Sequence, residues 1–272
     1  MIAVGDPVGV TLGEAAIGVL ETADPAAKAA ASHRAAAAWR EGALSVASVR
    51  WPPDRPARPE QPKLLLPKEM PKRKAGGSAA KRIALLHALA HIELNAIDLA
   101  WDLIARFGMP ETPRAFFDDW VTVADEEALH FELLAARLGE LGAAYGDLPA
   151  HDGLWQAAEE TAEDLLARLA VVPLVLEARG LDVTPGMIAE MKRCDDSATA
   201  AVLERIYRDE IGHVAAGMRW FDAFARADGY EPKAKWQELV RRYFRGALKP
   251  PFNDAARQSA LMPADFYLPI AS

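Results

Sequence analysis

The chain of 272 residues contains one cysteine, Cys194, so an intrachain disulfide is excluded and a reducing compartment is expected. β-Branched residues seldom cluster, and strand-like alternation of apolar and polar residues does not persist. No stretch approaches the roughly 18 uncharged apolar residues of a membrane span, and the N-terminus lacks the pattern of a signal peptide. We therefore expect an all-α, cytoplasmic protein with no membrane partner.

Basic residues are fewer than acidic ones, with 31 Lys and Arg against 39 Asp and Glu, which gives a net charge of -8. Such a chain does not bind nucleic acid through bulk charge, although a local basic patch stays open as an alternative. Hydrophobic residues make up 51% of the chain, and alanine is common. This is enough apolar material for one sizeable core, and too little for two large domains.

Four long helices are predicted in the middle of the chain, where apolar residues recur at helical spacing between start and stop signals. Thr112 is expected to cap the second helix, with Pro113 in its first turn, and Gly180 is expected to end the third. A tight loop makes the first two helices antiparallel neighbours, and a longer link joins the two pairs, which is typical of a four-helix bundle with a long crossover. The predicted helices span residues 78–107, 112–141, 152–180 and 197–227.

The regions on either side of this bundle are predicted to differ from it. Two N-terminal helices are expected, one capped by Thr11 and one over residues 25–44. A short helix is expected at 184–193 and another at 232–244, followed by an irregular surface tail. The predicted domains are therefore 1–77 for the N-terminal helices and arm, 78–230 for the bundle, and 231–272 for the C-terminal extension.

Residues 51–78 form a proline-rich arm, in which seven prolines exclude regular helix. Two interpretations stay open. The arm is an extended linker, or it wraps over the bundle with Trp51 and residues 64–66 as its anchors.

Two E-x-x-H motifs lie on the second and fourth predicted helices, as Glu127–His130 and Glu210–His213. Positions i and i+3 share one face of a helix, so the two side chains of each motif can reach the same ion. One such motif is a weak indication, because the pattern is short.

The order of the acidic residues is more informative. Glu93 lies on the first predicted helix, 34 residues before Glu127, and Glu177 lies on the third, 33 residues before Glu210. The first pair of helices thus supplies one Glu and one E-x-x-H motif, and the second pair supplies the same. This is the ligand set of the ferritin-like carboxylate proteins. The predicted metal ligands are Glu93, Glu127, His130, Glu177, Glu210 and His213.

The chemistry of this set predicts two metal ions. Four carboxylates balance two divalent cations, and two imidazoles supply one neutral ligand to each. Oxygen-rich sites with some nitrogen favour iron, with Fe/Mn or Mn/Mn as alternatives. A different interpretation is an ordinary bundle whose charges lie at the edges of the apolar stripes, although a carboxylate within a stripe is unfavourable unless it is paired or metal-bound.

Several neighbours of the ligands are candidates for supporting roles. Asp209 is predicted to accept the second N–H of His130, and Glu126 that of His213, which would set the histidine tautomers. Tyr207, one turn before Glu210, is either a redox-active or hydrogen-bonding neighbour or a core or rim aromatic.

Other candidates have a structural alternative. His91 either binds metal or is a structural histidine with its hydrogen bonds satisfied. Arg179 either pairs with a carboxylate, binds an anionic substrate, or forms a surface ion pair. Pro173, four residues before Glu177, is expected to kink the third helix, which either opens a channel or places Glu177, or the proline is simply tolerated there.

Three phrases, YGDLPAHDGLW, LEARGLDVTP and RDEIGHVAAGMRWF, resemble an uncharacterised bacterial ferritin-like family, a domain of unknown function numbered 455, and the last two include Glu177, Glu210 and His213. The resemblance covers roughly residues 78–260. More remotely, the ligand pattern is similar to diiron tRNA hydroxylases, ferritins, rubrerythrins and the small subunit of ribonucleotide reductase. The resemblance implies the bundle and the metal site, and it implies no substrate.

The leading functional hypothesis is a dimetal-carboxylate oxidoreductase that uses O2 or peroxide to hydroxylate or oxidise an unknown small molecule or modified nucleoside. Such an oxygenase needs an electron donor as a partner, and a homo-oligomer stays open. The alternatives are iron handling, as a ferroxidase or in peroxide detoxification, and a non-catalytic bundle stabilised by metal.

Overall fold

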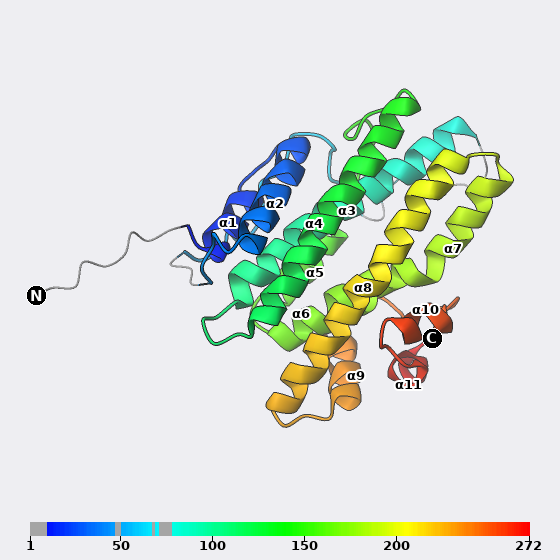
Figure 1. Ribbon diagram of the computed structural model, residues 1–272. Helices are drawn as coiled ribbons and strands as arrows, with labels where there is room; N and C mark the ends of the chain where they lie inside the picture. Colours follow the sequence, from blue (N-terminus) through cyan, green and yellow to red (C-terminus); the bar gives the residue numbers. More distant parts are fainter. Residues whose placement is uncertain (1–9, 47–49, 67–68, 71–77) are drawn as a thin grey trace, which may run out of the picture. The chain divides into compact units, whose positions relative to one another are not determined.

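The computed structural model describes residues 10–46, 50–66, 69–70 and 78–272, and within these ranges it is all-helical with no β-strand (Figure 1). The chain divides into two compact units, Met1–Pro59 with Ala96–Leu129, and Glu60–Asn95 with His130–Ser272. The division crosses two continuous helices, α3 (Ala79–Phe107) and α4 (Arg114–Glu140), so each of them contributes one end to each unit. The domain boundaries after residues 77 and 230 stay a prediction.

The first unit contains the two predicted N-terminal helices, α1 (Leu12–Leu20) and α2 (Pro25–Arg40). Thr11 caps α1 reciprocally: its hydroxyl accepts from Glu14 N at 3.1 Å, and its own N–H donates to Glu14 Oε2 at 2.9 Å. Both helices are therefore confirmed, although α2 ends at Arg40, four residues earlier than predicted, before Gly42 with its φ of 74°.

Residues 50–66 of the proline-rich arm pack against other segments of the protein. Ala57 N donates to Leu20 O at 2.8 Å, and Leu65 N donates to Ala150 O at 2.8 Å. Arg58 pairs with Asp98, which also pairs with the fully buried Lys28. Burial lowers the pKa of Lys28, and the Asp98 carboxylate opposes this shift. The wrapped arm is therefore the interpretation that holds for residues 50–66.

The predicted anchors do not act through buried side chains, although the backbone of Leu65 holds the arm to Ala150. Trp51 is 69% exposed, and Leu64 and Leu66 are 40% and 50% exposed. The buried residues of this segment are instead prolines, and the backbone hydrogen bonds described above hold it in place. The positions of its apolar side chains did not indicate either contact. The prolines are Pro52, Pro56 and Pro62. Residues 67–68 and 71–77 lie outside the described ranges.

In the second unit, α7 (Ala178–Arg193) and α8 (Ser197–Ala227) run side by side in opposite directions, joined by a turn at residues 194–196 (Figure 1). The prediction for α8 is confirmed at both ends. Asp196 caps it by accepting from Thr199 N at 3.0 Å, and Gly229, with φ of 81°, follows it.

The predicted third helix is wrong as a single element ending at Gly180. It is divided into α5 (Gly153–Glu160), α6 (Leu165–Val171) and a π-helical turn, η2 (Val172–Glu177), after which α7 continues through the residues expected to form a separate short helix. Asp164 caps α6, since its carboxylate accepts from Ala167 N at 2.9 Å. Gly180 does not have the positive φ that ends a helix at glycine.

Two further boundaries differ from the predictions. Thr112 does not cap α4, because its hydroxyl accepts from Met109 N at 3.1 Å and the helix begins after Pro113. The C-terminal helix is confirmed as α9 (Pro232–Tyr243), but the tail after it is not irregular. It forms α10 (Asp254–Ser259), α11 (Ala264–Tyr267) and the 3-10 turn η3 (Leu268–Ile270), because it buries side chains against α7, α8 and α9.

By its length and composition alone, helix α3 could cross a membrane. No other helix in the described ranges is both long and apolar enough. Of its most apolar window, 67% is buried inside the fold. Buried Asn95, Asp98 and Asp102 on the same helix fit a core helix of a soluble protein better than a membrane span.

Candidate metal centre

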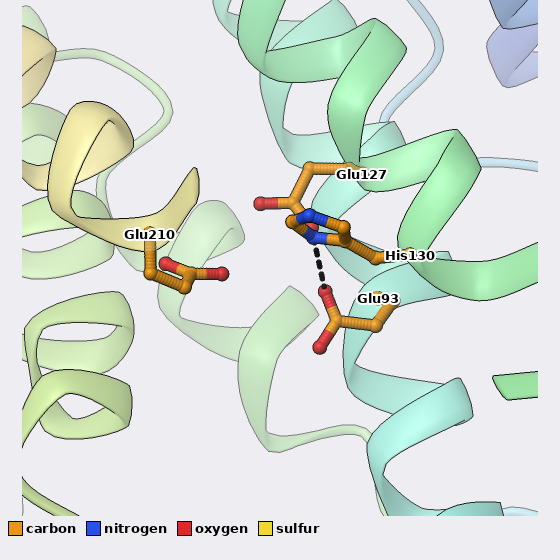
Figure 2. Close-up of side chains that lie close together, drawn as sticks. All are labelled: Glu93, Glu127, His130 and Glu210. Carbon is orange, nitrogen blue, oxygen red and sulfur yellow. Dashed lines mark ion pairs between the residues drawn. The ribbon is translucent and has the colours of Figure 1, made fainter. Parts of the chain in front are cut away.

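Four of the six predicted ligands lie together: Glu93, Glu127, His130 and Glu210 (Figure 2). Each offers one ligand atom, these atoms all lie within 4.8 Å of one another, and all four residues are buried. Figure 2 shows the side chains turned towards one another from three helices. This group is able to bind a metal ion.

The local helical structure explains how these residues come together. Glu127 precedes His130 by three residues on the continuous helix α4, so both side chains leave the same face one turn apart. Glu93 lies on α3 and Glu210 on α8, each at a buried position of its helix. The E-x-x-H spacing therefore places Glu127 beside His130 although the division between the two units falls between them.

The imidazole of His130 is held between two carboxylates. Its Nδ1 lies 3.5 Å from Glu93 Oε2, and its Nε2 lies 3.1 Å from Asp209 Oδ2. If Asp209 accepts a proton held on Nε2, the lone pair of Nδ1 points into the group. The contact predicted between Asp209 and His130 is thus present, while its effect on metal binding stays a prediction.

Asp209 is in turn held by Arg205, whose Nε donates to Asp209 Oδ2 at 2.5 Å. Burial favours the neutral carboxyl, but hydrogen bonds from His130 and Arg205 outweigh this effect and lower the pKa of Asp209. Asp209 is therefore a carboxylate at neutral pH. Arg205 was not among the predicted residues, although its position four residues before Asp209 on α8 is a recognisable signal for such a pair.

The other two predicted ligands, His213 and Glu177, are not among the four. His213 is 1% exposed, its Nδ1 lies 3.7 Å from Glu210 Oε1, and its ring centroid lies 5.7 Å from that of His130. Glu177 is half-buried at the end of η2, and η2 packs against α8. His213 is thus at the edge of the group, and ligation by either residue stays a prediction.

The donor set fits a hard or borderline divalent cation. Donors on opposite sides of an ion with bonds of about 2.1 Å lie about 4.2 Å apart, close to the 4.8 Å limit of the group. Three carboxylates at this separation repel one another unless they take up protons or a cation. Carboxylate oxygen with imidazole nitrogen suits iron, manganese or zinc better than a soft metal.

Tyr207 and Arg179 contact the C-terminal tail. The amide of Asn253 donates to Tyr207 Oη at 2.9 Å, and Arg179 Nη1 donates to Lys249 O at 2.7 Å and Pro251 O at 3.0 Å. A catalytic part for Tyr207 stays a prediction, as does the pairing of the half-buried Glu126 with His213.

His91 has the contacts of a structural histidine. Its Nδ1 lies 2.8 Å from Tyr145 Oη, and its Nε2 lies 3.2 Å from His151 O. One turn earlier, His87 Nε2 accepts from Gly146 N at 3.0 Å. The two rings therefore hold the link between α4 and α5, and this agrees with the structural alternative for His91.

Comparison with known proteins gives a family and a relative. The model of a family described as "Protein of unknown function (DUF455)" matches residues 21–268. An "Uncharacterized protein" of Haemophilus influenzae (strain ATCC 51907 / DSM 11121 / KW20 / Rd) is 43% identical over 207 residues, which cover 74% of this chain and 72% of that protein. No solved structure matches the chain.

Proposed function

We propose that this chain, which belongs to the family described as "Protein of unknown function (DUF455)", is a metal-dependent oxidoreductase with two iron ions in a ferritin-like helical bundle. The observation that carries the proposal is the buried group of three carboxylates and one imidazole on α3, α4 and α8. The second E-x-x-H motif supports a second ion, since His213 lies beside Glu210 at the edge of this group.

In this proposal the six residues divide between two ions. Glu93 and His130 would hold one ion, Glu177 and His213 would hold the other, and Glu127 and Glu210 would contribute to both. When bound, two reduced iron ions would supply two electrons for the reduction of O2 or peroxide, and an external electron donor would reduce them again. The substrate is a small molecule or a modified nucleoside that undergoes hydroxylation or another oxidation.

The chain's own residues prepare the site for this chemistry. Asp209 keeps a proton on Nε2 of His130 and so leaves Nδ1 as the ligand atom. Burial of Glu127 and His130, both 0% exposed, excludes water from one side of the site and strengthens the attraction between carboxylate and cation. The four donors lie at buried positions on helices, which limits their movement and holds them in place for a metal ion.

Metal analysis tests the proposal directly. Protein purified from iron-replete cells is expected to contain transition metal, and its anaerobically reduced form is expected to change its absorption spectrum on exposure to O2. The matched pair of variants is Glu127→Gln, which should lose metal, and Glu132→Gln, an exposed position on the same helix, which should keep it. A wild-type protein that holds no transition metal and takes up none on reconstitution contradicts the proposal.

A second measurement separates an oxidoreductase from an iron-handling protein. Reduced protein that consumes O2 without releasing or accumulating ferric iron supports the oxidoreductase. Continued uptake of Fe(II) beyond two ions per chain, with formation of a ferric core, contradicts it and supports storage instead.

A further inference from the structure

Gly217 on α8 lacks a side chain where the π-helical turn η2 approaches the helix. A Cβ atom at this position would lie 2.7 Å from Pro173 Cβ, 2.9 Å from Pro173 Cγ and 3.2 Å from Leu174 Cδ2. Carbon atoms prefer separations of about 3.5–4.0 Å, so the first two contacts require a movement. The proline ring is rigid and belongs to the backbone, so the turn itself would have to move. Gly217 therefore forms a notch that receives Pro173.

Pro173 is also the residue that changes the helical register. It has no N–H, so it cannot donate to the carbonyl four residues earlier, and the α-helical pattern is lost at this point. At the other end of the turn, Ala178 N donates to Pro173 O, which is the five-residue spacing of a π-helix. One extra residue in a helix rotates the following side chains by about 100°. The direction of Glu177, the last residue of η2, therefore depends on this turn.

The contact between Pro173 and Gly217 lies close to both predicted ligands of the second ion. Pro173 precedes Glu177 by four residues, and Gly217 follows His213 by four residues. Beyond the turn, the chain is held independently, because Arg257 Nη2 donates to Ala178 O at 3.4 Å. A displacement of Pro173 would thus be absorbed between residues 174 and 177, which includes Glu177.

We infer that Gly217 is a positioning residue: its notch seats Pro173, maintains the π-helical turn, and so places Glu177 to hold the second metal ion. The inference rests on the proposed function for the part of Glu177 as a ligand. The packing of the turn against α8 does not depend on metal.

Two glycine-to-alanine variants on one helix test the inference. Gly217→Ala introduces the clash, whereas Gly212→Ala, on an exposed part of α8 with no heavy atom within 4 Å of the added Cβ, does not. Metal content is expected to stay at about two ions per chain in the wild type and Gly212→Ala, and to fall to about one in Gly217→Ala. Amide hydrogen exchange of the metal-free proteins is expected to rise at least about tenfold at Ala178 in Gly217→Ala alone.

A second variant approaches the same turn without adding bulk. Pro173→Ala restores an N–H and allows an α-helical register, so it is expected to lose the second ion even if Gly217→Ala fails to fold. Either variant that keeps both ions at wild-type affinity, or a folded Gly217→Ala protein with unchanged exchange at Ala178, overturns the inference. If the wild type binds no metal, the proposed function and the ligand role of Glu177 are both refuted. If the exchange at Ala178 is then also unchanged in Gly217→Ala, the claim that Gly217 maintains the π-helical turn is refuted as well.

Discussion

Nε2 of His130 lies 3.1 Å from Oδ2 of Asp209, the residue that immediately precedes Glu210 on α8. Helix α8 therefore supplies Glu210 to the buried group and also supplies Asp209, whose carboxylate contacts His130 of α4. We predict that this arrangement orients the ring and favours one tautomer, as carboxylates behind metal-bound histidines do.

Replacement of Asp209 by asparagine tests this contact. An asparagine amide can donate to Nε2, which would move the ring proton to Nδ1 and away from its predicted position. We expect Asp209→Asn to weaken metal binding by about 10- to 100-fold, measured by competition with a chelator. Asp222→Asn, in an exposed ion pair with Arg226 on the same helix, should leave the affinity unchanged. Equal affinities for wild type and Asp209→Asn would show that the contact does not tune the site.

Metal removal is expected to destabilise the protein. Without a cation, Glu93, Glu127 and Glu210 repel one another within 4.8 Å, whereas a metal at about 100 times its Kd adds about 2.7 kcal/mol to the free energy of unfolding. EDTA should therefore lower the Tm of the wild type. Glu127→Gln, which removes one charge and the metal together, should have a Tm that EDTA does not change. A wild-type Tm that is insensitive to EDTA after confirmed metal loss would contradict this.

The C-terminal tail is expected to contribute strongly to stability through one buried ion pair. Arg257, 2% exposed, donates from Nε to Asp182 Oδ1 at 2.8 Å and from Nη2 to Asp182 Oδ2 at 2.7 Å. Loss of one partner leaves a buried charge, so Arg257→Gln should reduce the free energy of unfolding in urea by about 3–5 kcal/mol. Arg226→Gln, in an exposed pair, should reduce it by less than about 1 kcal/mol. Similar losses for the two variants would refute a special role for the buried pair.

The stability of the protein is expected to depend on the ionisation of Asp196. Burial opposes ionisation, but hydrogen bonds from Thr199 and the charge of Arg137 outweigh it and lower the pKa of Asp196. A carboxyl with a lowered folded-state pKa stabilises fully above its unfolded pKa of about 3.9, and this contribution is lost as the pH falls through the folded pKa.

Asp196→Asn isolates this charge, because asparagine is an equally good helix cap. The variant should have a lower Tm than the wild type at pH 7, and the difference should shrink below about pH 4. Thermal unfolding of both proteins between pH 2.5 and 7 measures this difference. A gap in Tm that is constant across the range would assign the effect to shape and not to charge.

The sequence by itself determined the features that depend on neighbours along the chain. The cap of α1 by Thr11, and the start and end of α8, follow from cap residues and helical periodicity, and all are present. The i, i+3 spacing placed Glu127 and His130 on one face, and the position of Asp209 beside Glu210 led to its contact with His130. These relationships act within one or two turns, where residue type is sufficient to predict geometry.

Only the tertiary structure decided the features that depend on contacts between distant segments. Pro173 indicated from the sequence that the third predicted helix is disturbed, but its division into separate elements and the π-helical turn involve the contact of Pro173 with Gly217, 44 residues later. The tail folds into α10 and α11 because Asp182 receives Arg257 in a buried pair, which no local pattern of the tail indicates. Burial and long-range packing change the free energy of each segment by more than its local preferences do, so these elements could not be predicted from the sequence alone.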